Sequence, residues 1–137
     1  MAATPGYSGT PLARKLGIAA GSCIAVVDAP PGYRDWLEPL PPGAQVLAYP
    51  APRVALVHLF VTRREILAER LAEFRSTLGP EVAIWVSWPK KASKQPTTVS
   101  EDVIRELALP LGLVDIKVCA VSDIWSGLKL VLRKALR

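Results

Sequence analysis

The sequence predicts an α/β protein with a mostly parallel sheet of five to six strands that ends in an antiparallel hairpin. Three observations support this fold class. Half of the 137 residues are hydrophobic, which suits strands covered by helices on both faces. Short apolar runs alternate along the chain with segments of helical periodicity, as in βαβ units. Too few residues separate the last two apolar runs for a helical crossover, so these runs are expected to pair antiparallel.

Six apolar runs are the candidate strands. They cover residues 23–28, 44–49, 53–62, 82–88, 114–121 and 128–134. The third run is apolar almost throughout, which favours burial on both faces and a central place in the sheet. Its separation from the second run is too short for a crossover helix. The second strand is therefore expected to be short, peripheral or antiparallel.

Two longer helices are expected in the second half of the chain. The first begins at Thr62, which stands at capping-box spacing from Glu65, and its apolar residues recur at helical spacing until Gly79. The second begins near Thr98 or Ser100, both of which are good N-cap residues. Each helix follows one strand and precedes another, which is the pattern of parallel strands joined by crossover helices.

Two shorter helices are expected nearer the N-terminus, at residues 12–16 and 33–40, where prolines mark the boundaries. After the first helix the order is β-α-β-β-α-β-α-β-β. This order predicts a single α/β domain over residues 1–137 with a three-layer, Rossmann-like architecture. In such folds, ligands bind at the carboxyl ends of the parallel strands.

The net charge of +5 is unevenly distributed, because residues 88–98 and 125–137 carry cations and no acidic residue. Such clusters attract phosphates, nucleic acids or acidic proteins. No apolar run approaches the ~18–20 residues of a membrane-spanning helix, so no membrane partner is expected. Residues 1–7 lack the basic start and the apolar block of a secretory signal, which predicts a cytoplasmic protein.

Both cysteines lie within apolar runs. Cys23 and Cys119 are therefore expected to be reduced thiols that pack as small hydrophobic side chains. The two-residue period of a strand places Asp115, Lys117 and Cys119 on one face of the run at residues 114–121. On that face, Lys117 is exposed, paired with an acid or directed into a cavity.

The loops that follow the parallel strands should gather at one edge of the sheet. They cover residues 28–33, 62–64, 88–94 and 122–126. We expect basic and aromatic side chains from these loops to form a site for an anion, with tryptophans as its walls or as a stacking platform. The candidate ligand-binding residues are Trp88, Lys90, Lys91, Lys94, Lys117, Trp125 and Lys129.

The sequence contains no recognisable catalytic constellation. His58, the single histidine, lies within an apolar run and is expected to be a hydrogen-bonded core residue, and one histidine cannot form a metal site. No serine has the strand–turn–helix setting of a nucleophile elbow. The turn after the first strand contains Pro30 and Pro31, which have no N–H to offer a phosphate. We therefore predict no catalytic residue, no metal and no cofactor.

Four motifs together resemble an uncharacterised bacterial family that is classed as a domain of unknown function. They are Gly-Tyr-Ser-Gly at residues 6–9, Trp-Pro-Lys-Lys at 88–91, Gly-Leu-Val-Asp-Ile-Lys-Val-Cys-Ala at 112–120 and Trp-Ser-Gly-Leu-Lys at 125–129. The resemblance spans nearly the whole chain. It implies no particular activity and assigns no residue a catalytic role.

The second half of the chain is also similar, in its order of elements, to the end of S-adenosylmethionine-dependent methyltransferases, which finish in an antiparallel pair of strands. That resemblance implies a glycine-rich turn after the first strand and an acidic residue that closes the second. This chain has Pro30-Pro31 at the first place and Tyr49-Pro50 at the second. The resemblance therefore extends to the fold and not to the residues that bind the cofactor.

Three functions fit these observations. The first is a small binding or regulatory domain that holds an anionic small molecule or an acidic protein at the carboxyl edge of the sheet. The second is a degenerate methyltransferase-like transferase, with Asp28, Lys117 or Asp123 near the reacting groups. The third is nucleic-acid binding through the basic C-terminal hairpin. An exposed edge at the last strand would also allow a homodimer.

Overall fold

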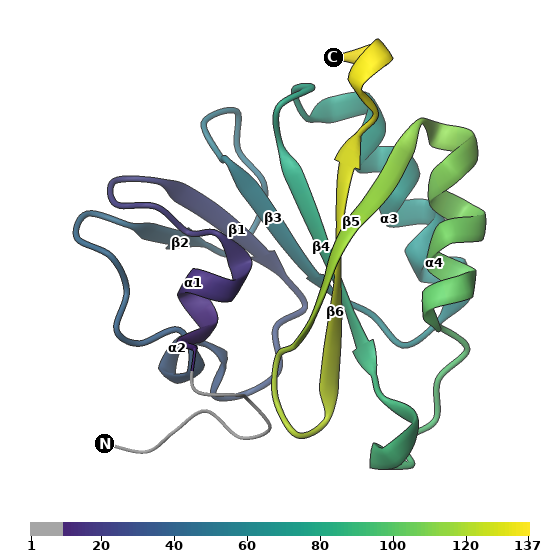
Figure 1. Cartoon of the computed structure of the whole chain (residues 1–137), viewed down its shortest axis with the longest axis horizontal. Helices are drawn as coiled ribbons and strands as arrows, with labels where there is room; N and C mark the ends of the chain where they lie inside the picture. The colour runs from purple at the N-terminus through teal and green to yellow at the C-terminus, as the bar shows by residue number, and fades with distance from the viewer. Residues whose placement is uncertain (1–9) are drawn as a thin grey trace.

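A six-stranded mixed sheet forms the centre of the protein (Figure 1). The computed structural model describes residues 10–137. Two predictions concern segments outside the described residues: the motif at residues 6–9 and the absence of a secretory signal at residues 1–7. The strands are β1 (Cys23–Val27), β2 (Gln45–Leu47), β3 (Leu56–Phe60), β4 (Ala83–Pro89), β5 (Leu113–Ala120) and β6 (Trp125–Leu132).

The strand order is β2-β1-β3-β4-β6-β5. Strands β1 to β4 run parallel to one another, and β6 is antiparallel to both β4 and β5. The prediction of a mostly parallel sheet that ends in an antiparallel hairpin is confirmed. The carboxyl ends of β1, β3 and β4 and the turn between β5 and β6 share one edge, at the bottom of Figure 1.

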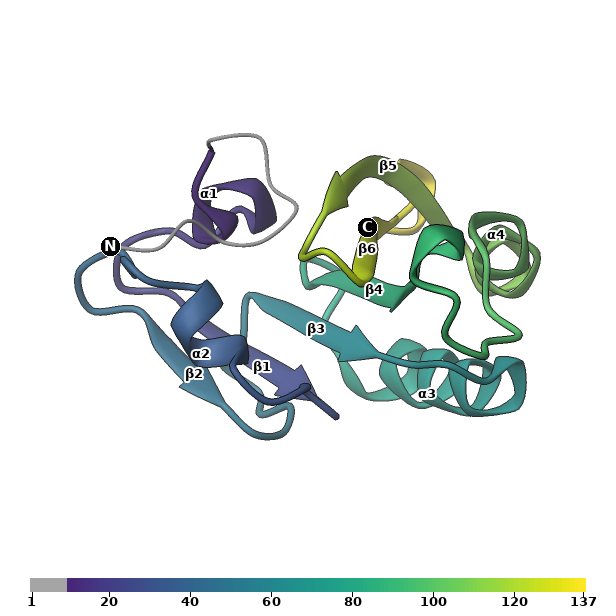
Figure 2. The same cartoon turned by 90° about the horizontal axis from the view of Figure 1, so that it is seen from below.

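Helices cover both faces of this sheet (Figure 2). The α-helices are α1 (Leu12–Leu16), α2 (Tyr33–Trp36), α3 (Arg64–Thr77) and α4 (Glu101–Ala108), and single 3-10 turns are formed by Lys91–Ser93, Leu109–Leu111 and Lys134–Leu136. The pair α1 and α2 packs on one face, and α3 and α4 pack on the other, which confirms the three-layer architecture. Among residues 10–137, no helix has the length and apolar character needed to cross a membrane.

The central strand β3 contributes to a hydrophobic core on each face of the sheet. Val57 and Leu59 pack toward α3 and α4, whereas Leu56 and Phe60 pack toward α1 and α2, because successive side chains of a strand alternate. All of its residues are buried, as predicted for this run. Burial of each large apolar side chain stabilises the fold by about 1.5–3 kcal/mol, so β3 joins the two cores firmly.

The edges of the sheet differ in part from expectation. Strand β2 has only three residues, lies at one edge and pairs parallel with β1, so the short and peripheral alternatives were correct and the antiparallel one was wrong. The last strand, β6, is not an edge, because it lies between β4 and β5. The second edge is β5, on which Ile116 and Val118 are about half exposed.

The hairpin turn is shorter than the predicted one, and β6 begins at Trp125 instead of Leu128. The Ser122 hydroxyl accepts hydrogen bonds from the backbone N–H groups of Ile124 and Trp125, which closes the turn within a few residues. Gly127 therefore lies inside the strand and not in the turn. A Cβ atom there would lie only 3.1–3.4 Å from the buried side chains packed against it.

The start of α3 shows a cap that comes from a distant segment. Thr62 does not cap the helix, so the predicted capping box is wrong. Instead, the Thr98 hydroxyl accepts a hydrogen bond of 2.7 Å from the Arg64 N–H. The prediction for α4 is confirmed at Ser100, whose hydroxyl accepts from the Val103 N–H. The segment between β4 and α4 thus holds the first turns of both helices.

Candidate functional site

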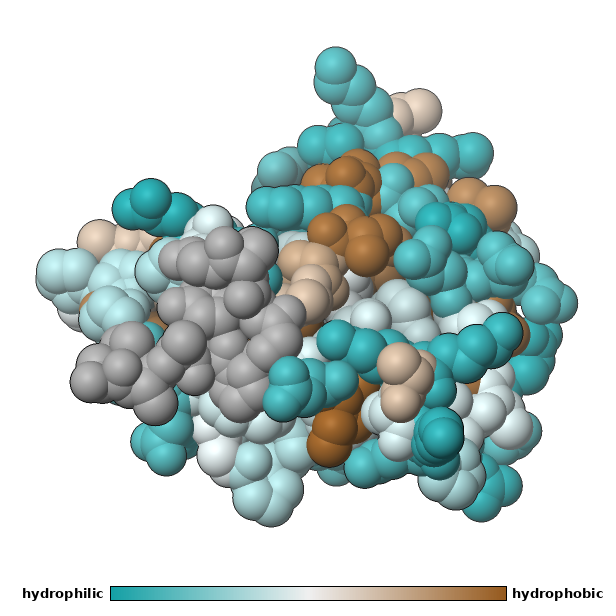
Figure 3. All heavy atoms as spheres, turned by 60° about the horizontal axis from the view of Figure 1, so that its bottom comes forward, coloured by the Kyte–Doolittle hydropathy of each residue, from teal (hydrophilic) through white to brown (hydrophobic). Residues whose placement is uncertain are grey.

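A pocket of about 270 Å³ opens at the carboxyl edge of the sheet, and we call it the rim pocket. Its lining residues come from the ends of β1 and β3, from the start of α3 and from the start of β6; they are Asp28, Phe60, Val61, Thr62, Arg63, Ile66 and Trp125. Three of the four predicted loops therefore meet here, as parallel strands require. Figure 3, with this edge turned forward, shows apolar residues at the surface between hydrophilic ones.

The wall of the rim pocket is aromatic. The ring of Trp125 meets the ring of Phe60 edge to face, with centroids 5.0 Å apart, and the Tyr33 ring also meets Phe60 edge to face at 5.3 Å. Phe60 is buried, whereas Trp125 is partly exposed. Because edge-to-face contacts favour one geometry, Phe60 holds the Trp125 ring in place and leaves part of it available to a ligand.

The rim pocket also carries one acidic and one basic side chain. Asp28, in a left-handed backbone conformation directly after β1, has its carboxylate 3.7 Å from the Arg70 guanidinium. Arg63 has its guanidinium 3.3 Å from the Glu65 carboxylate. The side chains of Asp28, Arg63 and Glu65 are 60% or more exposed, so both ion pairs are weak and open to competition from a ligand.

A buried chain of hydrogen bonds lies beneath Phe60. The Tyr33 hydroxyl is 2.8 Å from His58 Nδ1, and His58 Nε2 is 2.7 Å from the Ser87 hydroxyl. Burial lowers the pKa of His58 to about 3 and raises the pKa of Tyr33. The prediction of a hydrogen-bonded core histidine is confirmed. His58 and Ser87 have no exposed surface, so this chain positions the aromatic wall and does not itself face a ligand.

The lysine loop, residues 90–94, lies beside the rim pocket along the same edge. The Lys90 N–H donates a hydrogen bond of 2.7 Å to the carbonyl of Ile124, the residue before Trp125. Lys91 and Lys94 are exposed, and Lys94 has a left-handed backbone conformation. The loop after the fourth parallel strand is therefore attached directly to the strand that carries the pocket's tryptophan.

The structure separates the two tryptophans that were predicted to act together. Trp88 is only 7% exposed and packs in the core under α3 and α4. Trp125 packs on the opposite face, toward α1 and α2. The two residues lie in adjacent register positions on β4 and β6, where Pro89 is paired with Trp125 and Trp88 with Ser126. Because side chains alternate along a strand, Trp88 cannot reach the rim pocket.

Two of the predicted lysines also lie away from the rim pocket. A β-bulge at Ile116 shifts the register, so Asp115 is paired with Leu130 and Lys117 with Lys129. Asp115 then faces α4, where its carboxylate is 3.0 Å from Arg105 Nε, while Lys117 and Lys129 face α1. The prediction that Asp115 and Lys117 share a face is wrong because it assumed an unbroken two-residue period.

The cations that follow β6 lie at the edge of the sheet opposite the rim pocket. Arg133 and Lys134 follow the end of β6, which lies at the edge opposite the rim pocket because β6 runs antiparallel to β4. The positive charges of residues 125–137 therefore do not form one surface with the lysine loop. In the described part of the chain, no group of three His, Cys, Asp or Glu side chains is placed to hold a metal ion.

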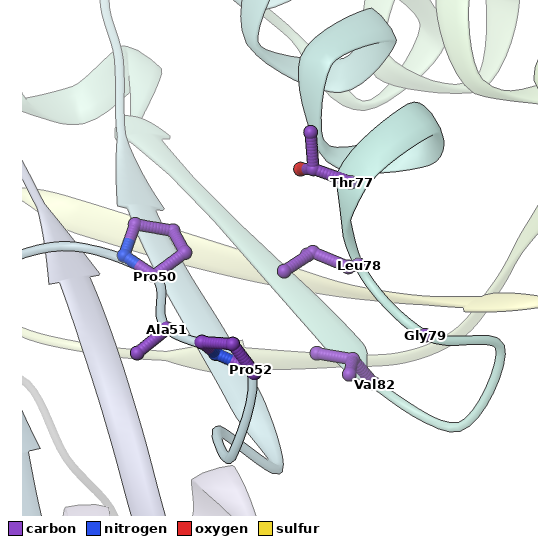
Figure 4. Close-up of a pocket in the computed structure, with 7 residues that line it drawn as sticks. All are labelled: Pro50, Ala51, Pro52, Thr77, Leu78, Gly79 and Val82. Carbon is purple, nitrogen blue, oxygen red and sulfur yellow. The ribbon is translucent and has the colours of Figure 1, made fainter.

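A further pocket, of about 410 Å³, lies at the opposite edge, before β3 and β4 (Figure 4). The side chain of Leu78 extends toward Pro50 across it. Its lining is mostly apolar and includes no charged residue. Sequence reasoning missed this pocket, and it also missed Phe60 in the rim pocket. The signal for Phe60 was present, because it lies two residues before the end of the predicted parallel strand at residues 53–62.

The fold resembles solved S-adenosylmethionine-dependent methyltransferases. One from Aquifex aeolicus has a TM-score of 0.62 at 13% identity, covering 88% of this chain and 87% of that chain. A putative type 11 methyltransferase from Sulfolobus solfataricus has a TM-score of 0.55 at 12% identity, covering 81% and 85%. The B. subtilis M1A22 tRNA methyltransferase TrmK has a TM-score of 0.56 at 10% identity, covering 90% and 66%.

The sequence itself matches no protein-family model and no curated protein. At 10–14% identity, the solved structures establish the fold alone. The similarity expected from the order of elements in the second half of the sequence is confirmed and extends over most of the chain. The protein therefore has a methyltransferase-like, Rossmann-like α/β fold, with its rim pocket at the edge where such folds bind ligands.

Proposed function

We propose that this protein binds a small anionic molecule that carries a planar ring. The ring lies in the rim pocket against Trp125, and the anionic group lies at the lysine loop. The observation that carries this proposal is the hydrogen bond between the Lys90 N–H and the Ile124 carbonyl. Because this bond is between backbone groups, it holds the cations and the aromatic surface side by side at little cost in side-chain entropy.

The charges at the rim pocket give the ligand an orientation. The Asp28 carboxylate repels an anion from the end of β1, whereas Arg63 and the lysine loop attract one. At about 270 Å³, the rim pocket lies just below the ~300–1,000 Å³ of most small-molecule sites. A single ring system fills such a space, and the remainder of the ligand extends over the loop.

Calorimetric titration with adenosine monophosphate tests this proposal, because the probe combines a planar ring with a phosphate. The variants are Trp125→Leu and the double substitution Lys90→Ala with Lys91→Ala. The double substitution is expected to weaken binding by about tenfold or more, since a charge-assisted hydrogen bond contributes about 1.5–3 kcal/mol. Trp125→Leu is expected to weaken binding by a similar factor, since stacking of a base on an aromatic ring contributes about 1–3 kcal/mol. The matched control is Lys134→Ala, which removes an exposed cation at the opposite edge. Unchanged affinity in the double variant would reject the proposed role of the lysine loop.

The fold likeness favours a second candidate, a methyltransferase-like transferase. Two features of this chain oppose it. The turn after β1 contains Pro30 and Pro31, which have no N–H groups for a ligand. After β2, the chain has Tyr49 instead of an acidic residue. The Tyr49 hydroxyl accepts from Arg70 and donates to Glu73, so Tyr49 supplies no carboxylate for a ribose. Titration with S-adenosylhomocysteine separates the candidates: tight binding supports the transferase, and no binding removes its main support.

A further inference from the structure

A groove between α1 and β5 gathers cations that the rim pocket does not use, and we call it the α1–β5 groove. Its volume is about 610 Å³, and it is lined by Thr10, Arg14, Lys15, Lys117, Val118, Cys119 and Ala120. Three of these residues are basic, and none of the lining residues is acidic. A concave surface with this charge pattern favours an anion.

Hydrogen bonds hold two of the cations in place at the α1–β5 groove. Lys15 Nζ donates to the Ala120 carbonyl at 3.2 Å, and Lys117 Nζ donates to the Lys15 carbonyl at 3.3 Å. These two bonds connect α1 with β5 and fix the positions of both ammonium groups. The Lys117 ammonium group has three N–H donors, so beside its hydrogen bond to the Lys15 carbonyl it retains donors for a bound ligand.

The positive charges at the α1–β5 groove repel one another. Lys117 is paired in register with Lys129, whose ammonium group lies 6.0 Å from the centre of the Trp85 ring. Like charges directly opposite in a sheet are destabilising. Within residues 10–137, neither Arg14 nor Lys117 forms an ion pair with an acidic side chain. Arg14 and Lys117 thus place positive charge at the groove that no acidic side chain of residues 10–137 pairs with.

We propose that the α1–β5 groove binds a small molecule that bears a phosphate group. The Arg14 guanidinium and the Lys117 ammonium group supply charge-assisted donors for the phosphate oxygens. The groove volume lies within the range of small-molecule sites. This site is separate from the rim pocket, because the two share no lining residue.

Cys119 provides a direct measure of the electric potential in the α1–β5 groove. Its thiol is partly buried; burial raises its pKa, whereas the nearby Lys15 and Lys117 act in the opposite direction. Iodoacetate and iodoacetamide alkylate the same thiolate, so the ratio of their rates does not depend on the pKa. A groove that concentrates anions raises the rate of the anionic reagent relative to that of the neutral one.

The experiment measures both alkylation rates at Cys119 by mass spectrometry of the intact folded chain at low ionic strength. The ratio of iodoacetate to iodoacetamide rates is expected to exceed that of free N-acetylcysteine by about fivefold and to fall in Lys117→Gln and Arg14→Gln. The matched control, Lys134→Gln, removes the same charge far from the groove. Cys23, which is 8% exposed, reports any general opening of the fold.

Pyrophosphate is the binding probe for the same groove. It is expected to protect Cys119 from both reagents in a saturable way and to raise the melting temperature more than sodium chloride of equal ionic strength. Both effects should be weaker in Lys117→Gln and unchanged in Lys134→Gln. Protection of Cys119 reports on this groove and not on the rim pocket, because Cys119 lines only the groove of the two. Failure of the rim proposal therefore leaves this result intact.

Three outcomes would overturn the phosphate site. One is a rate ratio at Cys119 equal to that of N-acetylcysteine. Another is pyrophosphate that neither protects Cys119 nor raises the melting temperature beyond the salt control. The third is protection by a single-stranded oligonucleotide alone, with a steep salt dependence, because this would assign the cations to a nucleic-acid backbone instead of a small molecule.

Discussion

Lys117 on β5 lies directly opposite Lys129 on β6, and both side chains face α1. A bulge at Ile116 produces this pairing, because the extra residue turns Lys117 away from the face that Asp115 occupies. Without the bulge, Lys117 would share a face with an acid. The local irregularity therefore creates a like-charge pair beside a groove, an arrangement that costs stability and that an anion would relieve.

The first prediction concerns this like-charge pair. Lys117→Gln is expected to raise the free energy of unfolding by about 0.2–1 kcal/mol at low salt, because it removes a cross-strand repulsion. In 1 M sodium chloride the gain should largely disappear, because salt screens exposed charges. Urea denaturation at both salt concentrations measures the effect. A loss of stability at low salt would show that the Lys117 hydrogen bond outweighs the repulsion.

The second prediction concerns the buried histidine. The pKa of His58 falls from 6.5 to about 3 on burial, so between these pH values the unfolded chain binds a proton that the folded chain does not. Its contribution to stability is therefore fully present above pH 6.5 and is lost as the pH falls toward 3. The slope is up to about 1.4 kcal/mol per pH unit.

Urea denaturation of the wild type and of His58→Gln between pH 4 and pH 7 isolates that contribution. The wild type should lose more stability on acidification than the variant. Because the chain has one histidine, its imidazole resonance can also be titrated without ambiguity. A measured pKa near 6.5 in the folded protein would contradict the buried Tyr33–His58–Ser87 chain.

The third prediction concerns the glycine inside β6. A Cβ atom at Gly127 would lie 3.1 Å from Val121 Cγ2 and 3.2 Å from Trp85 Cε3, and both of these side chains are fully buried. Gly127→Ala is therefore expected to destabilise the fold by about 1–2 kcal/mol, despite the entropy gained by removing a glycine. Gly79→Ala is the matched control, because its Cβ meets no atom within 4 Å.

The control Gly79→Ala should be neutral or stabilising by up to about 1 kcal/mol. Thermal melts of both variants make the comparison. Equal melting temperatures for the two variants would show that β6 can move away from β4. Because Trp125 is the first residue of β6, its position would then not be fixed by this packing.

The fourth prediction concerns the cap that Thr98 provides to α3. Thr98→Val keeps the shape of the side chain and removes the acceptor for the Arg64 N–H. We expect a loss of about 0.5–2 kcal/mol in the free energy of unfolding. Thr10→Val is the control, because Thr10 is exposed and lies outside this contact. Equal stability of Thr98→Val and the wild type would mean that water replaces the cap.

The strands and layers could be predicted from the sequence because burial on two faces leaves a strong apolar signal, as in β3. The meeting of Asp28, Thr62 and Trp125 followed from the rule that parallel strands end at one edge. Local contacts were also predictable, such as the Ser100 cap of α4.

The rest depends on tertiary packing that no local pattern records. The Thr98 cap comes from a residue 34 positions away in sequence. The bulge at Ile116 has no sequence signal, and it moved Lys117 to another site. Gly127 resembles a turn residue in sequence but lies within β6. A glycine is needed there because Trp85 and Val121 occupy the space of a side chain.

The central claim is that Trp125 and the lysine loop form one ligand site. The most direct measurement is nuclear magnetic resonance of the labelled protein during titration with adenosine monophosphate, using the indole N–H signals of the four tryptophans. The account predicts saturable shifts at Trp125 and at the amides of Arg63 and Lys90, with the buried Trp85 little changed. Shifts that spare Trp125 and appear only elsewhere would contradict it.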